Sequence, residues 1–214
     1  MKTVYGTLLN HRSALAALGD SVHEAPYKAP PKAPVLYIKP RNTWAGSGAD
    51  VVVPAGESEL EIGASLGLVF GRTACRVDEG SALQYIEGYT IVADISVPHS
   101  AFYRPSVRLK ARDGFCPMLP GAVPRAQVAN PDALALRVFI DGELVQRTST
   151  ADMLRPAARL ITDVSEFMTF SAGDMLLLGV AHGAPRARAG QSAAIEIDGL
   201  GRLEMRFVAA RETR

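Results

Sequence analysis

Short apolar runs rich in β-branched residues recur along the chain, separated by Gly, Pro and Asp-Gly turn signals. The first run, residues 35–39, is stopped by Pro40, and the run at 66–70 is ended by Gly71. Runs of this length and composition are typical of strands, because β-branched side chains pack well on a pleated surface. The predicted strands are residues 35–39, 66–70, 89–97, 134–140, 143–146, 175–180, 193–197 and 202–208.

Two turn signals predict that neighbouring strands pair as hairpins. Asp141-Gly142 separates the strands at 134–140 and 143–146. This dipeptide favours a type I′ turn, which needs a positive φ at both central residues. The stretch from Asp198 to Gly201 separates the last two strands in the same way and predicts a second, terminal hairpin.

Helical patterns are fewer. A short helix is predicted at 11–18, ended by Gly19, and another at 79–86, capped by Asp78 and ended by Gly88. The clearest helix runs over 156–168, where apolar residues repeat at helical spacing. Alternating βαβ units are absent, so the pattern predicts an α+β, mostly β fold in one domain, residues 1–214. The apolar face of the third helix comprises Leu160, Val164, Phe167 and Met168.

Composition and charge exclude several classes of protein. The net charge is +1 and the basic residues are spread along the chain, whereas a nucleic-acid interface needs a concentrated basic surface. No apolar run is long enough to cross a bilayer, and the polar residues soon after Gly6 argue against a signal peptide. Cys75 and Cys116 form no disulfide framework. We therefore expect a cytoplasmic protein that binds neither nucleic acid nor membrane.

The segment from Tyr103 to Leu119 concentrates basic residues beside a single acid, Asp113. Lys110 and Arg112 are two residues apart, so in an extended strand they would share a face. A cationic face close to a turn suits a small dicarboxylate. Alternatively, these residues form a solvated strand edge, where Lys and Arg prevent unwanted pairing. The basic residues are Arg104, Arg108, Lys110 and Arg112.

Several short sequence blocks occur in a fixed order along the chain. Each block alone is weak evidence for a family, but the ordered set is specific. The series spans the chain from about Gly6 to Val208, and no internal repeat interrupts it. The blocks are Asn10-His11-Arg12, Tyr27-Lys-Ala-Pro-Pro31, Tyr37-Ile-Lys-Pro-Arg-Asn-Thr43, Gly88-Tyr-Thr-Ile-Val-Ala-Asp94, Lys110-Ala-Arg-Asp-Gly-Phe115, Asp141-Gly-Glu-Leu-Val-Gln146, Thr150-Ala-Asp-Met153 and Ser171-Ala-Gly-Asp-Met175.

This ordered set resembles the fumarylacetoacetate hydrolase superfamily. The resemblance implies a mixed β-sheet roll with a few peripheral helices, in a protein that assembles at least as a dimer. Within the superfamily, the Tyr-Lys-Ala-Pro-Pro and Tyr-Arg-Pro blocks are most similar to the isomerases/decarboxylases of 4-hydroxyphenylacetate degradation. Those enzymes are built from two similar halves or from two similar subunits, and the first half characteristically lacks the metal-binding Glu pair.

The superfamily binds Mg²⁺ or Mn²⁺ through a Glu-x-Glu pair and an Asp, hard oxygen ligands that suit these ions. The positions here that match are Gly63, Ser65 and Asp94, so both Glu ligands are missing. The resemblance therefore implies no metal in this chain, with Mg²⁺ or Mn²⁺ in a sister subunit. Glu59 and Glu61 would replace the pair only if the strand shifted in register; otherwise they form a solvated acidic rim.

Further family positions also differ, since the early catalytic His falls near Ala14 and the Thr-Pro after the late strand is Val180-Ala181. The resemblance implies that Lys110 contacts acidic groups of the substrate, and a buried Asp94 would need Lys110 as its partner. We predict Lys110 and Asp94 as catalytic residues and assign a structural role to Asp113. Predicted substrate-binding residues are Arg104, Arg112 and Thr150, the alternatives being a surface ion pair for Arg104 and a helix N-cap for Thr150.

The resemblance implies a subunit of a 5-oxopent-3-ene-1,2,5-tricarboxylate decarboxylase / 2-hydroxyhepta-2,4-dienedioate isomerase. Its substrate would be a di- or tricarboxylate 2-oxo acid, and its partner a second copy or a similar metal-bearing chain. Two alternatives remain open. One is a non-catalytic scaffold for the sister chain, and the other is a different 2-oxo acid hydrolase of the superfamily, which the missing Glu pair disfavours.

Overall fold

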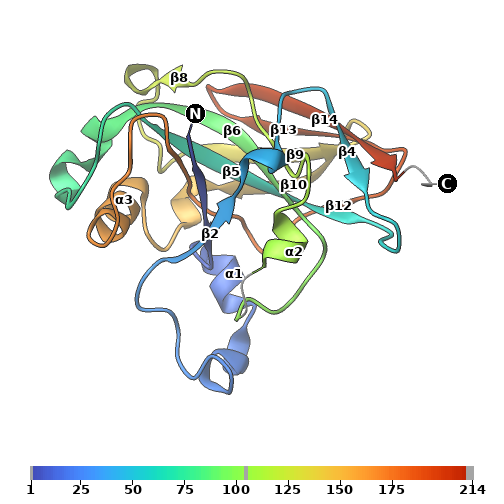
Figure 1. Ribbon diagram of the computed structural model, residues 1–214, viewed down its shortest axis with the longest axis horizontal. Helices are drawn as coiled ribbons and strands as arrows, with labels where there is room; N and C mark the ends of the chain where they lie inside the picture. Colours follow the sequence, from blue (N-terminus) through green and yellow to red (C-terminus); the bar gives the residue numbers. More distant parts are fainter. Residues whose placement is uncertain (1, 104–105, 211–214) are drawn as a thin grey trace.

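Two β-sheets, with a few short helices around them, make up the fold (Figure 1). The computed structural model describes residues 2–103 and 106–210. The strands join in both parallel and antiparallel pairs, so the sheets are mixed. This confirms the mostly β fold class. None of the helices in the described residues is long and apolar enough to span a membrane.

The larger sheet has seven strands and is centred on two long antiparallel strands, β5 and β6. Almost every residue of these two strands is buried, which explains why both appear in the sequence as nearly continuous apolar runs. Their register places Gly63 directly opposite Asp94. The strands, in sheet order, are β2 (Val35–Lys39), β1 (Val4–Leu8), β11 (Met175–Leu177), β5 (Leu60–Phe70), β6 (Ile86–Ser96) and β8 (Val123–Pro124), with β12 (Arg186–Ala187) also paired to β5.

The second sheet has five strands and contains both predicted hairpins. Asp141 and Gly142 have φ values of 50° and 88°, which are the positive angles that a type I′ turn requires. The turn at 198–200 joins the last two strands as expected. The strands, in sheet order, are β10 (Glu143–Ser149), β9 (Ala135–Ile140), β13 (Ser192–Ile197), β14 (Gly201–Ala209) and β4 (Ala49–Val53), while β3 (Trp44–Ala45) pairs separately with β7 (Cys116–Pro117).

The hydrophobic core lies between the two sheets. Strands β5 and β6 pack against β9, β13 and β14, and their inward side chains form one buried cluster. Phe70, Tyr89 and Phe207 are among its largest members and are almost completely buried. Burial of this apolar surface is the main stabilising contribution to the fold. Because the core uses only the inner face of β5 and β6, their outer face is available for a site.

Helix α3 (Ala157–Ser165) confirms the best helical prediction, with Pro156 immediately before its first turn. Leu160 and Val164 are completely buried on its inner face. The prediction was wrong about Phe167, which is 62% exposed because the helix ends at Ser165 and the chain turns away.

The other helices differ from expectation in type or extent. Residues Glu79–Tyr85 form a 3₁₀ helix, η3, and the Asp78 side chain does not cap it; instead, the Asp78 backbone carbonyl accepts bonds from Ser81. Strand β6 then begins at Ile86, so Gly88 lies within this strand and does not end the helix as predicted. The remaining short helices are α1 (Arg12–Ala16), η1 (Gly19–His23), η2 (Arg41–Thr43), α2 (Val107–Lys110), η4 (Arg125–Gln127) and η5 (Thr150–Asp152).

The segment around Lys110 is helical, so the prediction of an extended strand there was wrong. Lys110 is the last residue of α2, and its N–H donates to the Ser106 carbonyl at 2.9 Å, a helical i to i−4 bond. Lys110 and Arg112 therefore do not share a face. The helix directs Lys110 inward, where it is only 7% exposed, so the solvated-edge alternative is also wrong for this residue.

Gly6 on β1 leaves room for the ring of Tyr37, which lies on the neighbouring strand β2. The two residues are partners in the β1–β2 register, and a Cβ on Gly6 would overlap the Tyr37 ring. We expect Gly6→Ala to displace the ring and to lower the free energy of unfolding by about 1–3 kcal/mol, the usual cost of overpacking. Urea unfolding measures this, with Gly80→Ala as the control because a Cβ there meets open space. Equal stability of the two variants would contradict the prediction.

Candidate active site

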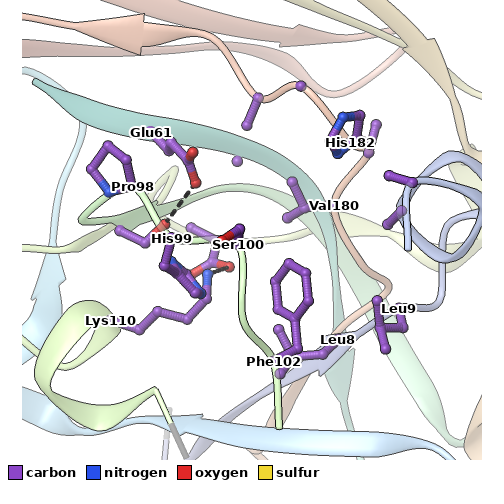
Figure 2. Close-up of a pocket in the computed structure, with 18 of the residues that line it drawn as sticks. Leu8, Leu9, Glu61, Pro98, His99, Ser100, Phe102, Lys110, Val180 and His182 are labelled. Atoms are coloured by element: carbon purple, nitrogen blue, oxygen red, sulfur yellow. Dashed lines mark hydrogen bonds and ion pairs between the residues drawn. The ribbon is translucent and has the colours of Figure 1, made fainter. Parts of the chain in front are cut away.

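A cavity of about 660 Å³ opens beside the outer face of β5 and β6, between the end of α1, the loop after β6 and the loop after β11. Asp94 and Lys110 line it. Apolar residues such as Phe102 and Val180 form part of its wall (Figure 2). The ionisable residues that line it are Glu61, Asp94, His99, Lys110, His182 and Arg186.

Asp94 is the charged centre of this site. It lies on β6 with its side chain 1% exposed, and two lysines hold it. The Lys110 ammonium is 2.7 Å from Oδ2, and the Lys39 ammonium is 2.7 Å from Oδ1. The Tyr37 hydroxyl also donates a short hydrogen bond to Oδ2. The buried carboxylate therefore has the partners that a buried charge requires.

The electrostatics of this cluster keep Asp94 ionised and Tyr37 protonated. Burial alone would raise the pKa of Asp94, but the ammonium groups of Lys110 and Lys39 outweigh it and hold that pKa well below its usual range. Burial lowers the pKa of Lys39, and the charge of Asp94 opposes that change. Burial, together with the nearby Asp94 charge, raises the pKa of Tyr37 well above its usual value. Tyr37 is therefore a hydrogen-bond donor at neutral pH.

The two lysines have different roles. Lys39 is completely buried and directs its ammonium at three backbone carbonyls at 2.7–2.9 Å, those of Ile95, Lys110 and Phe115. An ammonium has only three N–H donors, so Lys39 is fully committed to the fold and its contact with Oδ1 is purely ionic. Lys110 donates one hydrogen bond, to Asp94, among the described residues. Its other N–H groups remain available to a ligand in the cavity.

Sequence reasoning predicted the contact between Asp94 and Lys110 but missed Tyr37 and Lys39. Both missed residues lie on β2 at i and i+2, and both reach Asp94. The signal was present in the block from Tyr37 to Thr43, where a lysine interrupts an apolar strand immediately before Pro40. A lysine at such a position needs a buried acid as its partner.

Of the predicted substrate-binding residues, the structure describes Arg112 and Thr150, and neither of them lines this cavity. Arg112 is outside the cavity lining and donates to the Arg108 carbonyl. Thr150 is buried beside Leu134, whose N–H donates to the Thr150 hydroxyl at 2.8 Å. Ser149 is the cap of η5, so the N-cap alternative for Thr150 was wrong. Arg104 lies outside the described residues.

Asp113 has a structural contact, although it differs from the expected one. The Asn42 side chain donates to the Asp113 carboxylate at 2.7 Å. The turn N–H of Gly114 donates to the Asn42 carbonyl, not to Asp113. Asp113 thus links the turn after α2 to η2.

The residues at the family's metal-ligand positions do not fit a divalent ion. A Cβ added at Gly63 would lie 2.8 Å from both the Asp94 carbonyl oxygen and Val180 Cγ2, so a longer side chain has no room without rearrangement. The Ser65 hydroxyl accepts the Gly179 N–H at 3.3 Å. The Asp94 carboxylate is already neutralised by two lysines. No cluster of three or more His, Cys, Asp or Glu side chains suited to a metal occurs among residues 2–103 and 106–210.

Glu59 and Glu61 do not replace the missing ligands. Their carboxylates pair with Arg186 at 2.9 and 3.1 Å, on the rim of the cavity. Glu61 is opposite Ser96 in the β5–β6 register, two positions from Asp94, and no register shift aligns it with Asp94. The structure therefore agrees with the acidic-rim alternative, although an arginine, and not solvent alone, neutralises the rim.

The early family histidine is also replaced. Ala14, near the matching position, lines the cavity. His11 is buried before α1, and its Nδ1 accepts the Ser13 N–H as the helix N-cap. Burial lowers the pKa of His11, and Asp152 opposes that change.

Comparison with known proteins places the chain in a family. The model of the fumarylacetoacetate (FAA) hydrolase C-terminal family matches residues 3–208, so the chain belongs to this family. It is 40% identical over 210 residues to the 4-hydroxyphenylacetate degradation bifunctional isomerase/decarboxylase of Escherichia coli. That match covers 98% of this chain but only 48% of the relative, so the chain spans about half of its length.

Solved structures share the fold. A 5-carboxymethyl-2-hydroxymuconate delta-isomerase from Mycobacterium smegmatis superposes with a TM-score of 0.81 at 26% identity, covering 99% of this chain and 80% of that one. A fumarylpyruvate hydrolase from Pseudomonas aeruginosa, in complex with Mn²⁺ and pyruvate, gives 0.85 at 22% identity, covering 98% and 91%. The second likeness shows the fold alone.

The different roles of the two lysines predict different effects on stability. Lys39→Met leaves three backbone carbonyls without their donor and removes one of the two ion pairs of Asp94. We therefore expect the free energy of unfolding to fall by about 3–5 kcal/mol. Lys110→Met should cost clearly less, because Asp94 keeps Lys39 and Tyr37. Urea unfolding of both variants measures the difference. Equal losses would show that Lys110 is also a structural residue.

The poor fit of a divalent ion predicts that this chain binds no Mg²⁺ tightly. Too little ligand charge is available to offset dehydration of the ion. Calorimetric titration at neutral pH should show no saturable binding in the micromolar range. A stoichiometric micromolar site would contradict this, and its loss in a Glu59→Gln/Glu61→Gln variant would locate it on the rim.

Proposed function

We propose that this chain is a subunit of an isomerase/decarboxylase of the 4-hydroxyphenylacetate type and binds a 2-oxo dicarboxylate without a metal of its own. The observation that carries the proposal is the Lys110 ammonium in the lining of the cavity. Asp94 fixes its position through one hydrogen bond, and its other N–H groups are available to a ligand. Two ammonium groups and one carboxylate leave one net positive charge in the cluster. A cavity with that charge favours an anion.

The chemistry follows from where the charge develops. Loss of CO₂ from the γ-carbon of an α,β-unsaturated 2-oxo acid, or removal of a proton beside its carbonyl, moves an electron pair toward the carbonyl oxygen and forms a dienolate or an enolate. A preorganised ammonium near the carbonyl oxygen stabilises that charge more strongly in the transition state than in the ground state. Lys110 would occupy this position, with Asp94 and Lys39 fixing its orientation. By this proposal the substrates are 5-oxopent-3-ene-1,2,5-tricarboxylate and 2-hydroxyhepta-2,4-dienedioate, both of which react through dienol intermediates.

The proposed partner is a similar chain that carries the Glu-x-Glu pair and Mg²⁺ or Mn²⁺. The E. coli relative is about twice the length of this chain, which agrees with two similar halves. Edge strands β2 and β10 expose Ile38, Leu144 and Val145, the kind of apolar surface that a second subunit covers. We propose residues 1–214 as one domain of this assembly, in the reducing cytoplasm, where Cys75 and Cys116 stay free thiols as in the structure.

A scaffold without chemistry is the second candidate function. The missing metal ligands favour it, whereas the polar cavity does not, because a scaffold has no need of a buried ammonium that faces an open space. Assay of each chain alone, after co-purification with a sister chain, separates the two. Turnover by this chain alone would exclude the scaffold.

Binding of a 2-oxo diacid tests the proposal directly. We expect 2-oxoheptanedioate to bind the isolated chain, and Lys110→Met to weaken binding about tenfold or more, the scale of one charge-assisted hydrogen bond at about 1.5–3 kcal/mol. Arg108→Met is the matched control, since it removes the same charge from an exposed position on the same helix. Calorimetry gives both dissociation constants. Equal weakening in the two variants would indicate general electrostatics and not a site.

A further inference from the structure

His99 lies in the wall of the same cavity, in the loop that follows β6 (Figure 2). Its Nδ1 is 2.8 Å from the Val97 carbonyl oxygen. The Phe102 ring packs against the imidazole at an angle of 61°, with the ring centres 5.5 Å apart. These two contacts fix the orientation of the side chain, although the residue belongs to a loop.

The contact with Val97 determines which ring nitrogen carries the proton. A carbonyl oxygen can only accept, so Nδ1 must be the donor. In the neutral imidazole, Nε2 then presents its lone pair. Nε2 is buried and has no hydrogen-bond partner among the described residues. A buried nitrogen without a partner is costly, and such atoms are expected where a ligand or a reaction uses them.

The two carboxylates that line the cavity are ion-paired and are therefore poor proton acceptors, and His182, the other histidine of the lining, is exposed to solvent. Asp94 is held by two lysines, which keep its pKa low. Glu61 pairs with Arg186 at 3.1 Å. Ala14, near the family's early histidine position, has no proton-transfer group. Among the described cavity residues, His99 Nε2 and Asp94 Oδ1 are the buried polar atoms without a hydrogen-bond partner, and Oδ1 is already ion-paired with Lys39, which leaves the lone pair of His99 Nε2.

We propose that His99 is the catalytic base of this cavity and transfers the proton in the tautomerisation of a 2-oxo dicarboxylate. This inference rests on the proposed function, because it assumes that a 2-oxo acid binds beside Lys110. The C3–H bond breaks and its proton moves to Nε2. The electron pair of that bond forms the C2–C3 double bond, and the carbonyl π electrons move to the C2 oxygen, whose negative charge Lys110 stabilises.

The return step completes the cycle without any further reactant. Imidazolium Nε2–H gives its proton back to carbon: to C3 for simple exchange, or to a more distant carbon of a dienolate for isomerisation. The proton on Nε2 exchanges with solvent in between. Incubation in D₂O therefore places deuterium on C3 even when the substrate undergoes no net conversion.

Deuterium exchange separates the role of His99 from binding. Wild-type chain and 2-oxoheptanedioate are incubated in D₂O, and the C3–H signal is followed by NMR against an enzyme-free control. We expect His99→Gln to slow the catalysed exchange at least 100-fold, the usual scale of general base catalysis, while the dissociation constant changes less than twofold. His182→Gln should match wild type, since His182 is an exposed cavity residue outside the proposed machinery.

His99→Glu provides the second variant, because Glu and Gln have the same shape but only the carboxylate accepts a proton. Exchange at least tenfold faster in His99→Glu than in His99→Gln, with similar thermal unfolding, would support the role of a base. Wild-type exchange in His99→Gln, or binding without any exchange in the wild type, would overturn this inference and leave the proposed binding function standing. A wild type that does not bind 2-oxoheptanedioate would overturn both.

Discussion

The site depends on one constraint, that the carboxylate of Asp94 is buried in a long strand of the main sheet and must be neutralised there. Desolvation of a carboxylate is costly, and two ammonium groups together with a tyrosine hydroxyl compensate for it. These partners come from β2, which lies far from β6 in the sequence, and from α2, which is the next element after β6. Their placement requires the β1–β2 pairing, the small Gly6 beneath the Tyr37 ring, and the helical turn that directs Lys110 inward. The charge cluster and the fold around it therefore specify each other.

The same cluster gives a site without the family's Glu ligands a positive charge of its own, which is the basis of the proposed anion binding. In a metal-binding relative, three carboxylates would offset a divalent cation. Here two of the three acidic positions are Gly63 and Ser65, and the remaining carboxylate is surrounded by two lysines. In this chain the positive charge of the cluster comes from two ammonium groups and not from a metal ion. An ammonium cannot chelate two oxygens as a metal does, so orientation of the substrate must depend more on hydrogen bonds and on the shape of the cavity.

Sequence patterns predicted most strands and both hairpins, because short apolar runs rich in β-branched residues and Asp-Gly turns are local signals, but they missed β4 and the first half of β5. They failed around Lys110, where basic residues two apart suggested a strand face and the chain instead forms a helical turn. Phe167 fitted the helical period but lies beyond the end of α3, since periodicity does not report where a helix stops. At the site, Asp94 and Lys110 could be predicted from a resemblance and from the cost of a buried charge. The sequence also held a signal for Lys39 as a buried partner of an acid, but its three carbonyl acceptors and the free nitrogen of His99 could not be predicted, because they depend on which groups lie nearby in three dimensions.

The two lysines that contact Asp94 contribute to the site in different ways. Lys39 uses its three donors on backbone carbonyls of three different segments, so it cannot turn toward a ligand without breaking the packing around β6, α2 and β7. It therefore supplies a fixed positive charge on one side of Asp94. That charge helps to neutralise the carboxylate and leaves the Lys110 ammonium with one hydrogen bond among the described residues, beside its contact with the Tyr37 ring. A cluster arranged in this way is already organised before a ligand arrives, and electrostatic stabilisation is most effective when the dipoles and charges need not reorganise during the reaction. Removal of Lys39 would thus harm the site even though Lys39 never reaches the cavity.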